Sequence, residues 1–461
     1  MQTVKRGSLH ERHTTMTTRP IPGLVASLAI PTIVSMLVTA LYNMADTFFV
    51  GRINTSATAA VGVVFPLMTS IQVIGITLGV GSGSFIARLL GQKDSKRANR
   101  ATSTAFFTAL AVGALYTVGG ELLLTPLMRL LGSTESILPY ASGYARVVLF
   151  GAPFMAAAFV MNVNLRSEGS AVLSMIGLAS GAILNIALDP LFIFTFRMGI
   201  AGAAAATILS QFVSFCILLS HYLSRRSTLA IDPKNFSPKW EMYWEMLKSG
   251  LPTLFRQSFV TIAVITLNLA ARPFGDAALA GMTVVNRIMF FIMAMLIGFG
   301  QGFQPVAAFN YTAGFHHRVY QAFRFSVAVG TIALFFCALG AGVFAPFIIA
   351  IFRNDIEVIQ IGSLALRLQC VTLPLSPYIV ISNMMFQYIG KPVRASILAL
   401  ARQGLVFIPV LLVFSSLFGL FGVQLSQAVA DVLTFVLALP LTAGMVKTLA
   451  TEEVDNGGQA V

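Results

Sequence analysis

The chain has 461 residues, of which 56% are apolar and only 10% are charged, against about 25% charged in an ordinary soluble protein. This composition excludes a soluble globular protein, a disordered chain and a coiled coil. The net charge of +13 would indicate nucleic-acid binding in a soluble protein. Here the basic loops of a membrane protein explain it, so we expect no nucleic-acid partner.

Twelve apolar segments are long enough to cross a lipid bilayer, which takes about 20 residues per helix. We predict spans over residues 24–50, 58–87, 101–120, 138–163, 171–195, 199–222, 246–271, 278–308, 320–345, 360–387, 394–416 and 421–446. The predicted fold is an all-α polytopic membrane protein whose twelve helices form two six-helix lobes.

Lysine and arginine gather in the N-terminal tail, in the loop after the second span and in the polar segment 223–241, whereas the opposite loops carry single arginines. Cytoplasmic loops collect such residues, so we expect both termini in the cytoplasm. The tail lacks the short apolar region of a cleavable signal peptide, and we expect the first helix to be retained. The predicted parts are the tail 1–22, the N-lobe 23–222, the inter-lobe loop 223–241, the C-lobe 242–447 and the tail 448–461.

The two halves of the chain repeat each other at an offset of 219 to 221 residues. Each half has an even number of spans, so both enter the membrane from the same side and form a parallel repeat, as in many transporters. The matching pairs include Pro31 and Pro252, Arg146 and Arg367, Asn162 and Asn383, Gly169 and Gly390, and Gly199 and Gly419.

Three acidic residues, Asp46, Asp189 and Asp431, lie inside predicted spans. A charge at bilayer depth costs at least ~2.5–3.5 kcal/mol, so such residues are functional candidates. The alternative is that each faces water at a helix end or pairs with a buried arginine, and we favour this alternative for Asp431.

Asp189 has informative neighbours. Asn185 lies four residues earlier, on the same helix face, and Pro190 frees a backbone carbonyl from its helical bond. Oxygen ligands of this kind suit a hard cation. Asp46 and Thr207 are predicted at a similar depth, in the outer half of the first lobe. Since the second half has no acid at the matching places, we predict a single cation site in the N-lobe.

Five stretches of the chain resemble the multidrug and toxic compound extrusion (MATE) family, and within it the DinF-like bacterial branch. They are Leu41–Arg52 (LYNMADTFFVGR), Ala87–Asp94 (ARLLGQKD), Leu184–Pro190 (LNIALDP), Gly199–Thr207 (GIAGAAAAT) and Gln304–Tyr311 (QPVAAFNY). The resemblance covers nearly the whole chain. One departure is Thr312, where the family often has glycine after the Asn-Tyr pair.

The resemblance implies two six-helix lobes around a central cleft and export of amphiphilic, often cationic compounds in exchange for Na⁺ or H⁺. By resemblance, the cation-coupling site of the N-lobe comprises Asp46, Asn185, Asp189 and Thr207, while Tyr42 and Asn162 match positions of a substrate pocket. We expect no metal other than Na⁺ at the coupling site and no cofactor. The expected protein is a monomer in the bacterial inner membrane.

Two rival functions stay open. A lipid-linked oligosaccharide flippase of the related superfamily would line its cleft with many basic residues. An intramembrane aspartyl enzyme would need aligned aspartates and a second motif, which the sequence lacks, so we expect no enzyme activity. A further hypothesis concerns Pro31, which removes a helical hydrogen bond and permits a bend. We expect it to act as a hinge in the helix that carries Asp46, the alternative being a static kink.

Overall fold

A computed structural model describes residues 9–50, 53, 55–135 and 137–456, which form helices and loops without any strand. The outer parts of both predicted tails (1–8 and 457–461) lie outside the described residues, as do Gly51 and Arg52 at the end of one resembling stretch. Among the residues that the structure describes, eleven helices are long and apolar enough to cross a membrane. The last of them runs over 59 residues, Pro392–Ala450, and Gly419 interrupts it with a non-helical backbone (φ 59°, ψ −134°). It therefore holds two of the predicted spans, and the prediction of twelve is confirmed.

The described residues divide into two compact units. Within the described ranges, unit 1 comprises residues 9–15 and 34–250, and unit 2 comprises residues 16–33 and 251–456. The chain thus passes from one unit to the other inside α1 (Leu9–Thr18), α2 (Ile21–Val50) and α9 (Trp240–Ala271). These boundaries differ from the predicted lobes, which place α2 in the N-lobe from residue 23 onward and α9 in the C-lobe from residue 242 onward.

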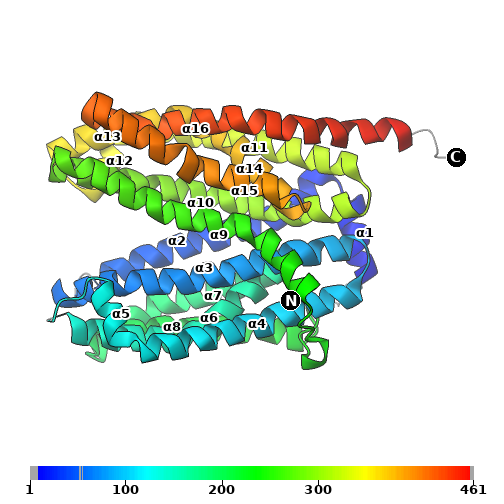
Figure 1. Ribbon diagram of the computed structural model, residues 1–461, viewed down its shortest axis with the longest axis horizontal. Helices are drawn as coiled ribbons and strands as arrows, with labels where there is room; N and C mark the ends of the chain where they lie inside the picture. Colours follow the sequence, from blue (N-terminus) through cyan, green and yellow to red (C-terminus); the bar gives the residue numbers. More distant parts are fainter. Residues whose placement is uncertain (1–8, 51–52, 54, 136, 457–461) are drawn as a thin grey trace. The chain divides into compact units, whose positions relative to one another are not determined.

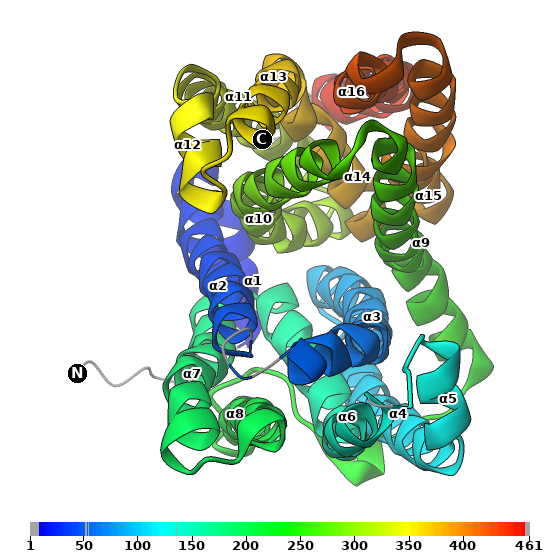
Figure 2. The same cartoon turned by 90° about the vertical axis from the view of Figure 1, so that its left-hand side faces the viewer.

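Unit 1 is a bundle around α6, which packs against α3, α4, α7 and α8, and Figure 2 shows α3 and α4 beside it. Glycines on α3 allow the close approach: a Cβ on Gly83 would lie 2.9 Å from Val163 of α6. Its helices are α3 (Thr55–Gly91), α4 (Ser95–Leu122), α5 (Leu124–Leu130), α6 (Leu138–Ser167), α7 (Ala171–Pro190), the π-helix η1 (Leu191–Thr195), α8 (Gly199–Leu223) and the 3₁₀ turn η2 (Pro233–Asn235).

Unit 2 repeats this bundle around α10, which packs against α11, α13 and α14, as the end-on view in Figure 2 also shows. The helices of each unit run side by side along their length (Figure 1). Those of unit 2 are the 3₁₀ turn η3 (Arg272–Phe274), α10 (Asp276–Thr312), α11 (His316–Val343), α12 (Ala345–Phe352), α13 (Ile356–Thr372), the 3₁₀ turn η4 (Leu373–Leu375), α14 (Ser376–Tyr388), α15 (Pro392–Leu400), the π-helix η5 (Ala401–Leu405) and α16 (Phe407–Asn456).

The duplication extends to single hydrogen bonds. Asn162 donates from Nδ2 to the carbonyl of Ser174 at 3.0 Å, and Asn383 donates in the same way to Ala395 at 2.6 Å. The glycines at the repeated turns share positive φ values as well. The values are 89° and 81° at Gly169 and Gly390, and 56° and 59° at Gly199 and Gly419. The predicted parallel repeat is confirmed.

In unit 2, the first part of α2 packs tightly on α10. A Cβ on Gly302 would lie 2.4 Å from the backbone nitrogen of Ala29. Thr32 donates its hydroxyl to the carbonyl of Gly298 at 2.6 Å. This segment of α2 is therefore an integral part of unit 2.

The first part of α9 has the matching place in unit 1. A Cβ on Gly81 of α3 would lie 2.1 Å from the carbonyl oxygen of Met246. Arg88 pairs with Glu245 at 3.5 Å and donates to the hydroxyl of Ser249 at 3.1 Å. Each unit thus contains the start of the helix whose remainder belongs to the other unit.

The inter-lobe loop is fixed to unit 1 by a buried carboxylate. Glu168, between α6 and α7, is fully buried. It accepts hydrogen bonds from the backbone of Thr228 (3.0 Å), from the hydroxyl of Ser227 (2.9 Å) and from Arg12 of α1 (3.0 Å). This side chain therefore links α1, the turn between α6 and α7, and the inter-lobe loop, and it holds the loop against unit 1. We call this anchored loop, residues 223–241, the strap.

Candidate functional site

Two of the predicted coupling residues lie one turn apart on α7, opposite α8. The amide of Asn185, oriented to satisfy its neighbours, donates to the carboxylate of Asp189 at 3.0 Å and accepts from the backbone N–H of Thr207 at 3.2 Å. All three residues are at most 2% exposed. The spacing of four residues thus places the amide and the carboxylate on one face, as predicted.

α2 supplies the remaining members from its part in unit 1. The side chain of Tyr42 lies close to that of Thr207. Asp46 interacts electrostatically with Tyr42 and with Asp189. One carboxylate oxygen of Asp46 is buried and has no hydrogen-bond partner among the residues that the structure describes. The structure therefore gathers Tyr42, Asp46, Asn185, Asp189 and Thr207 into one cluster.

Tyr144 of α6 is a member of this cluster that sequence reasoning missed. Its side chain is fully buried and interacts electrostatically with Tyr42, Asp46 and Asp189. Tyr144 belongs to no motif, and only the packing of α6 against its neighbours brings it to the acids. A single tyrosine within an apolar span does not by itself indicate a functional residue.

The chemistry of the cluster is that of an oxygen-rich, acidic site. An ionised carboxylate can accept about four hydrogen bonds, whereas Asp189 receives one from Asn185 and the buried oxygen of Asp46 has none among the described residues. No three residues of the His, Cys, Asp and Glu types come together anywhere in the described ranges. Two carboxylates with a hydroxyl and an amide can hold a proton or a small hard cation such as Na⁺.

The backbone beside Asp189 departs from the α-helix, as the proline predicted. Pro190 ends α7, and the next five residues form the π-helix η1, in which Phe196 donates to the carbonyl of Leu191 at 2.9 Å. π-helical turns are rare and are frequent at functional sites. This irregular turn begins two residues after Asp189.

Asn162 lies apart from this network in its hydrogen bonding. Its amide joins α6 to the carbonyl of Ser174 on α7, and Asn383 makes the same bond in the half that lacks the acids. The bond therefore belongs to the repeated architecture. The assignment of Asn162 to a substrate pocket stays a prediction.

Pro31 is buried in α2, and the helix continues through it. It lies in the part of α2 that packs in unit 2, three residues before Val34, where the chain returns to unit 1. Asp46 lies on the same helix in unit 1. The proposed hinge thus stands where α2 passes from one unit to the other.

Asp431 has the partner expected of an acid outside the coupling site. It is 1% exposed, and Arg402 donates to it at 3.1 Å. The prediction that Asp431 pairs with an arginine is confirmed, although Arg402 is half-buried rather than buried. Arg402, which sequence analysis did not connect with Asp431, lies in η5.

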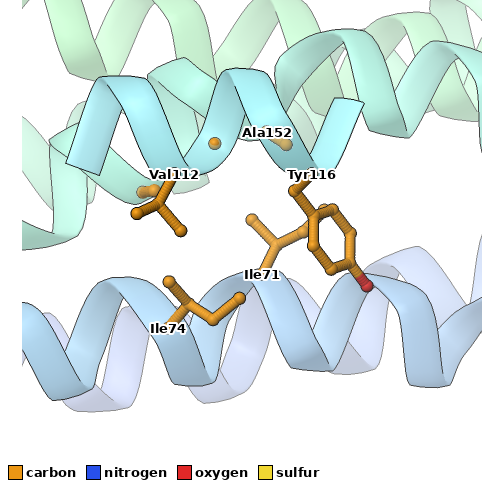
Figure 3. Close-up of a pocket in the computed structure, with 7 residues that line it drawn as sticks. Ile71, Ile74, Val112, Tyr116 and Ala152 are labelled. Atoms are coloured by element: carbon orange, nitrogen blue, oxygen red, sulfur yellow. The ribbon is translucent and has the colours of Figure 1, made fainter. Parts of the chain in front are cut away.

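A narrow gap, too small to hold a water molecule, lies elsewhere in unit 1 between α3, α4 and α6. Figure 3 shows Ile71, Ile74 and Val112 around it, with Tyr116 at one end. The hydroxyl of Tyr116 bonds to Ser70. Because its lining is almost wholly apolar and includes none of the clustered acids, we assign it to packing.

Comparisons with known proteins agree with this architecture. The MatE family profile matches residues 31–191 and 252–413, one match in each half. The multidrug export protein MepA of Staphylococcus haemolyticus (strain JCSC1435) is 27% identical over 414 residues, which are 89% of this chain and 91% of that protein. Solved MATE structures described as a straight and a bent conformation are 27% identical. Each covers 98% of this chain, which covers 99% of each, with TM-scores of 0.88 and 0.87. The predicted resemblance is confirmed, and the chain belongs to the MatE family.

Proposed function

We propose that this chain exports amphiphilic, often cationic organic compounds in exchange for inward Na⁺ or H⁺, by alternating access. The observation that carries the proposal is the cluster of Asp46 and Asp189 with Tyr42, Asn185 and Thr207 inside the membrane-spanning part of unit 1. The name of the similar Staphylococcus protein, a multidrug export protein, supports the class of substrate.

Cation binding follows from the electrostatics of the two acids. Burial and mutual repulsion both disfavour two ionised carboxylates side by side, so a proton or Na⁺ that enters the cluster removes an energetic cost. Asn185 keeps one oxygen of Asp189 in place through its amide. The hydroxyl of Thr207 and the open oxygen of Asp46 are further ligands within the same cluster.

The link from cation to substrate is proposed to run through α2. Asp46 belongs to the part of this helix in unit 1, whereas Pro31 belongs to the part that packs on α10 in unit 2. A change in the charge at Asp46 favours a different position of the segment of α2 that lies in unit 1. Pro31 lowers the energetic cost of bending α2 between its two segments. Straight and bent MATE structures support a fold with two arrangements.

The driving force is sufficient for such an exchange. A membrane potential of 100 mV supplies ~2.3 kcal/mol per charge moved, which corresponds to roughly fifty-fold accumulation. We expect the exporter to act as a monomer in the bacterial inner membrane, with both termini in the cytoplasm, and to need no cofactor.

The test is transport of a fluorescent lipophilic cation in proteoliposomes with the Na⁺ and proton gradients imposed one at a time. We expect one of the gradients to drive uphill transport. An Asp276→Asn variant, which removes an exposed acid from the first turn of α10, should transport like wild type. Uphill transport that ignores both gradients would contradict the proposal.

A further inference from the structure

Unit 2 contains a second buried polar cluster, in which an arginine holds an acid. Arg402 donates from Nε to Asp431 at 3.1 Å and from Nη2 to the hydroxyl of Ser376 at 3.1 Å. Gln427 donates to the same oxygen of Asp431, also at 3.1 Å. These residues come from η5, α14 and α16, all within membrane-spanning helices.

The repeat places this cluster within about one helical turn of the positions that match the coupling residues of unit 1. At the offset of 220 residues, Gln427 corresponds to Thr207 and Asp431 to Gln211. At the offset of 221, Arg402 corresponds to Gly181, one helical turn before Asn185. Both clusters therefore lie between the fifth and sixth spans of their own unit.

Both clusters also lie beside a π-helix in the same span of the repeat. In unit 1, η1 follows directly after Asp189, and in unit 2, η5 contains Arg402. The two π-helices do not match in the repeat, since η5 corresponds to residues 180–184 at the offset of 221 whereas η1 is Leu191–Thr195. Each is nevertheless a rare turn of a kind that is frequent at functional sites.

The two clusters differ in their balance of charge. In unit 1, the structure shows no ion pair for Asp46 or Asp189 among the described residues, so two acids stand without a basic partner. In unit 2, one acid is matched by one guanidinium. A guanidinium stays charged at any physiological pH, so Arg402 cannot release Asp431 by losing a proton.

The fold does not require this ion pair. The corresponding positions of unit 1, Gly181 and Gln211, carry no charge, and that half forms its helical bundle without an ion pair there. A buried ion pair is also weak support for stability, because the cost of desolvating both ions offsets their attraction. Stability therefore does not explain the Arg402–Asp431 pair, and a role in cation binding is the alternative.

We propose that Arg402 is a tethered cation that fills the unit 2 counterpart of the coupling site. While its guanidinium holds Asp431, no Na⁺ or proton binds there, and coupling is confined to unit 1. This inference rests on the proposed function of the unit 1 cluster. Without the guanidinium, the carboxylate of Asp431, the amide oxygen of Gln427 and the hydroxyl of Ser376 form an oxygen site for a monovalent cation.

The experiment counts the cations bound per molecule of purified full-length protein, with ²²Na⁺ and with proton uptake measured in parallel. Arg402→Gln should bind one cation more than wild type. Arg402→Gln combined with Asp431→Asn should return to the wild-type count, and Arg402→Lys should not exceed it. A wild-type count in a folded Arg402→Gln protein would overturn the proposal.

The double variant keeps the proposal falsifiable where Arg402→Gln alone does not fold, because it replaces both charges by neutral amides. The double variant should bind as many cations per molecule as wild type. A lower number would overturn the proposal, because it would mean that Asp431 binds an external cation even when Arg402 is present. Failure of the unit 1 site is read separately. If the unit 1 site does not bind the coupling cation, Asp189→Asn will bind as many cations as wild type. The difference in bound cations between Arg402→Gln and the double variant does not depend on Asp189, so it tests unit 2 alone.

Discussion

Replacing Gly81 by alanine tests whether the start of α9 packs against α3 in unit 1, although the rest of α9 belongs to unit 2. The added Cβ would lie 2.1 Å from the carbonyl oxygen of Met246 and 3.0 Å from its carbon, whereas a carbon and a carbonyl oxygen ordinarily approach to about 3.3 Å. The start of α9 must then move by roughly 1 Å against backbone rather than against a flexible side chain. Overpacking of this kind costs about 1–3 kcal/mol.

The assay is thermal unfolding of the purified protein in detergent, where we expect Gly81→Ala to lower the melting temperature by roughly 1 to 3 °C. Gly143→Ala is the matched control, because nothing lies within 4 Å of its added Cβ and alanine is about 0.5–1 kcal/mol better than glycine in a helix. Equal melting temperatures for Gly81→Ala and wild type would refute the close packing of α3 on the start of α9.

Three further predictions concern the hinge, the second acid and the strap. Pro31→Ala should slow transport and reduce a cation-dependent change in spin-label distances between α2 and α7; no such change in wild type would leave a static kink. Asp431→Asn should weaken transport per folded molecule less than Asp189→Asn does, although it leaves Arg402 unpaired and lowers the melting temperature; the reverse ranking would move the coupling site into unit 2. Glu168→Gln should make the inter-lobe loop more sensitive to protease, because a neutral amide cannot pair with Arg12 and accepts weaker hydrogen bonds; unchanged cleavage would contradict its role as an anchor.

Much of the fold could be predicted from the sequence because hydropathy and repeats are local or periodic signals. Each predicted span overlaps a helix of the structure. Asn185 and Asp189 were predictable as a pair because a spacing of four residues fixes their shared face. Their approach to Thr207 followed from the matching depth of two neighbouring spans.

Other contacts could not be predicted because they depend on packing between distant segments. No sequence pattern places Tyr144 beside the acids or Arg402 beside Asp431, which is 29 residues away along the chain. The start of α2 reads as part of the first lobe by order along the chain, yet it packs with α10. Glu168 reads as an ordinary loop acid, and only its fully buried position in the structure reveals the strap.

The most direct test of the central claim compares two kinds of transport by Asp189→Asn in the same proteoliposomes. The substitution keeps the volume and an acceptor for Asn185 but removes the negative charge. We predict that the variant still exchanges labelled for unlabelled substrate at equal concentrations and no longer accumulates substrate when a cation gradient is imposed, while Asp276→Asn does both. Gradient-driven accumulation by Asp189→Asn at the wild-type level would contradict the assignment of coupling to this carboxylate.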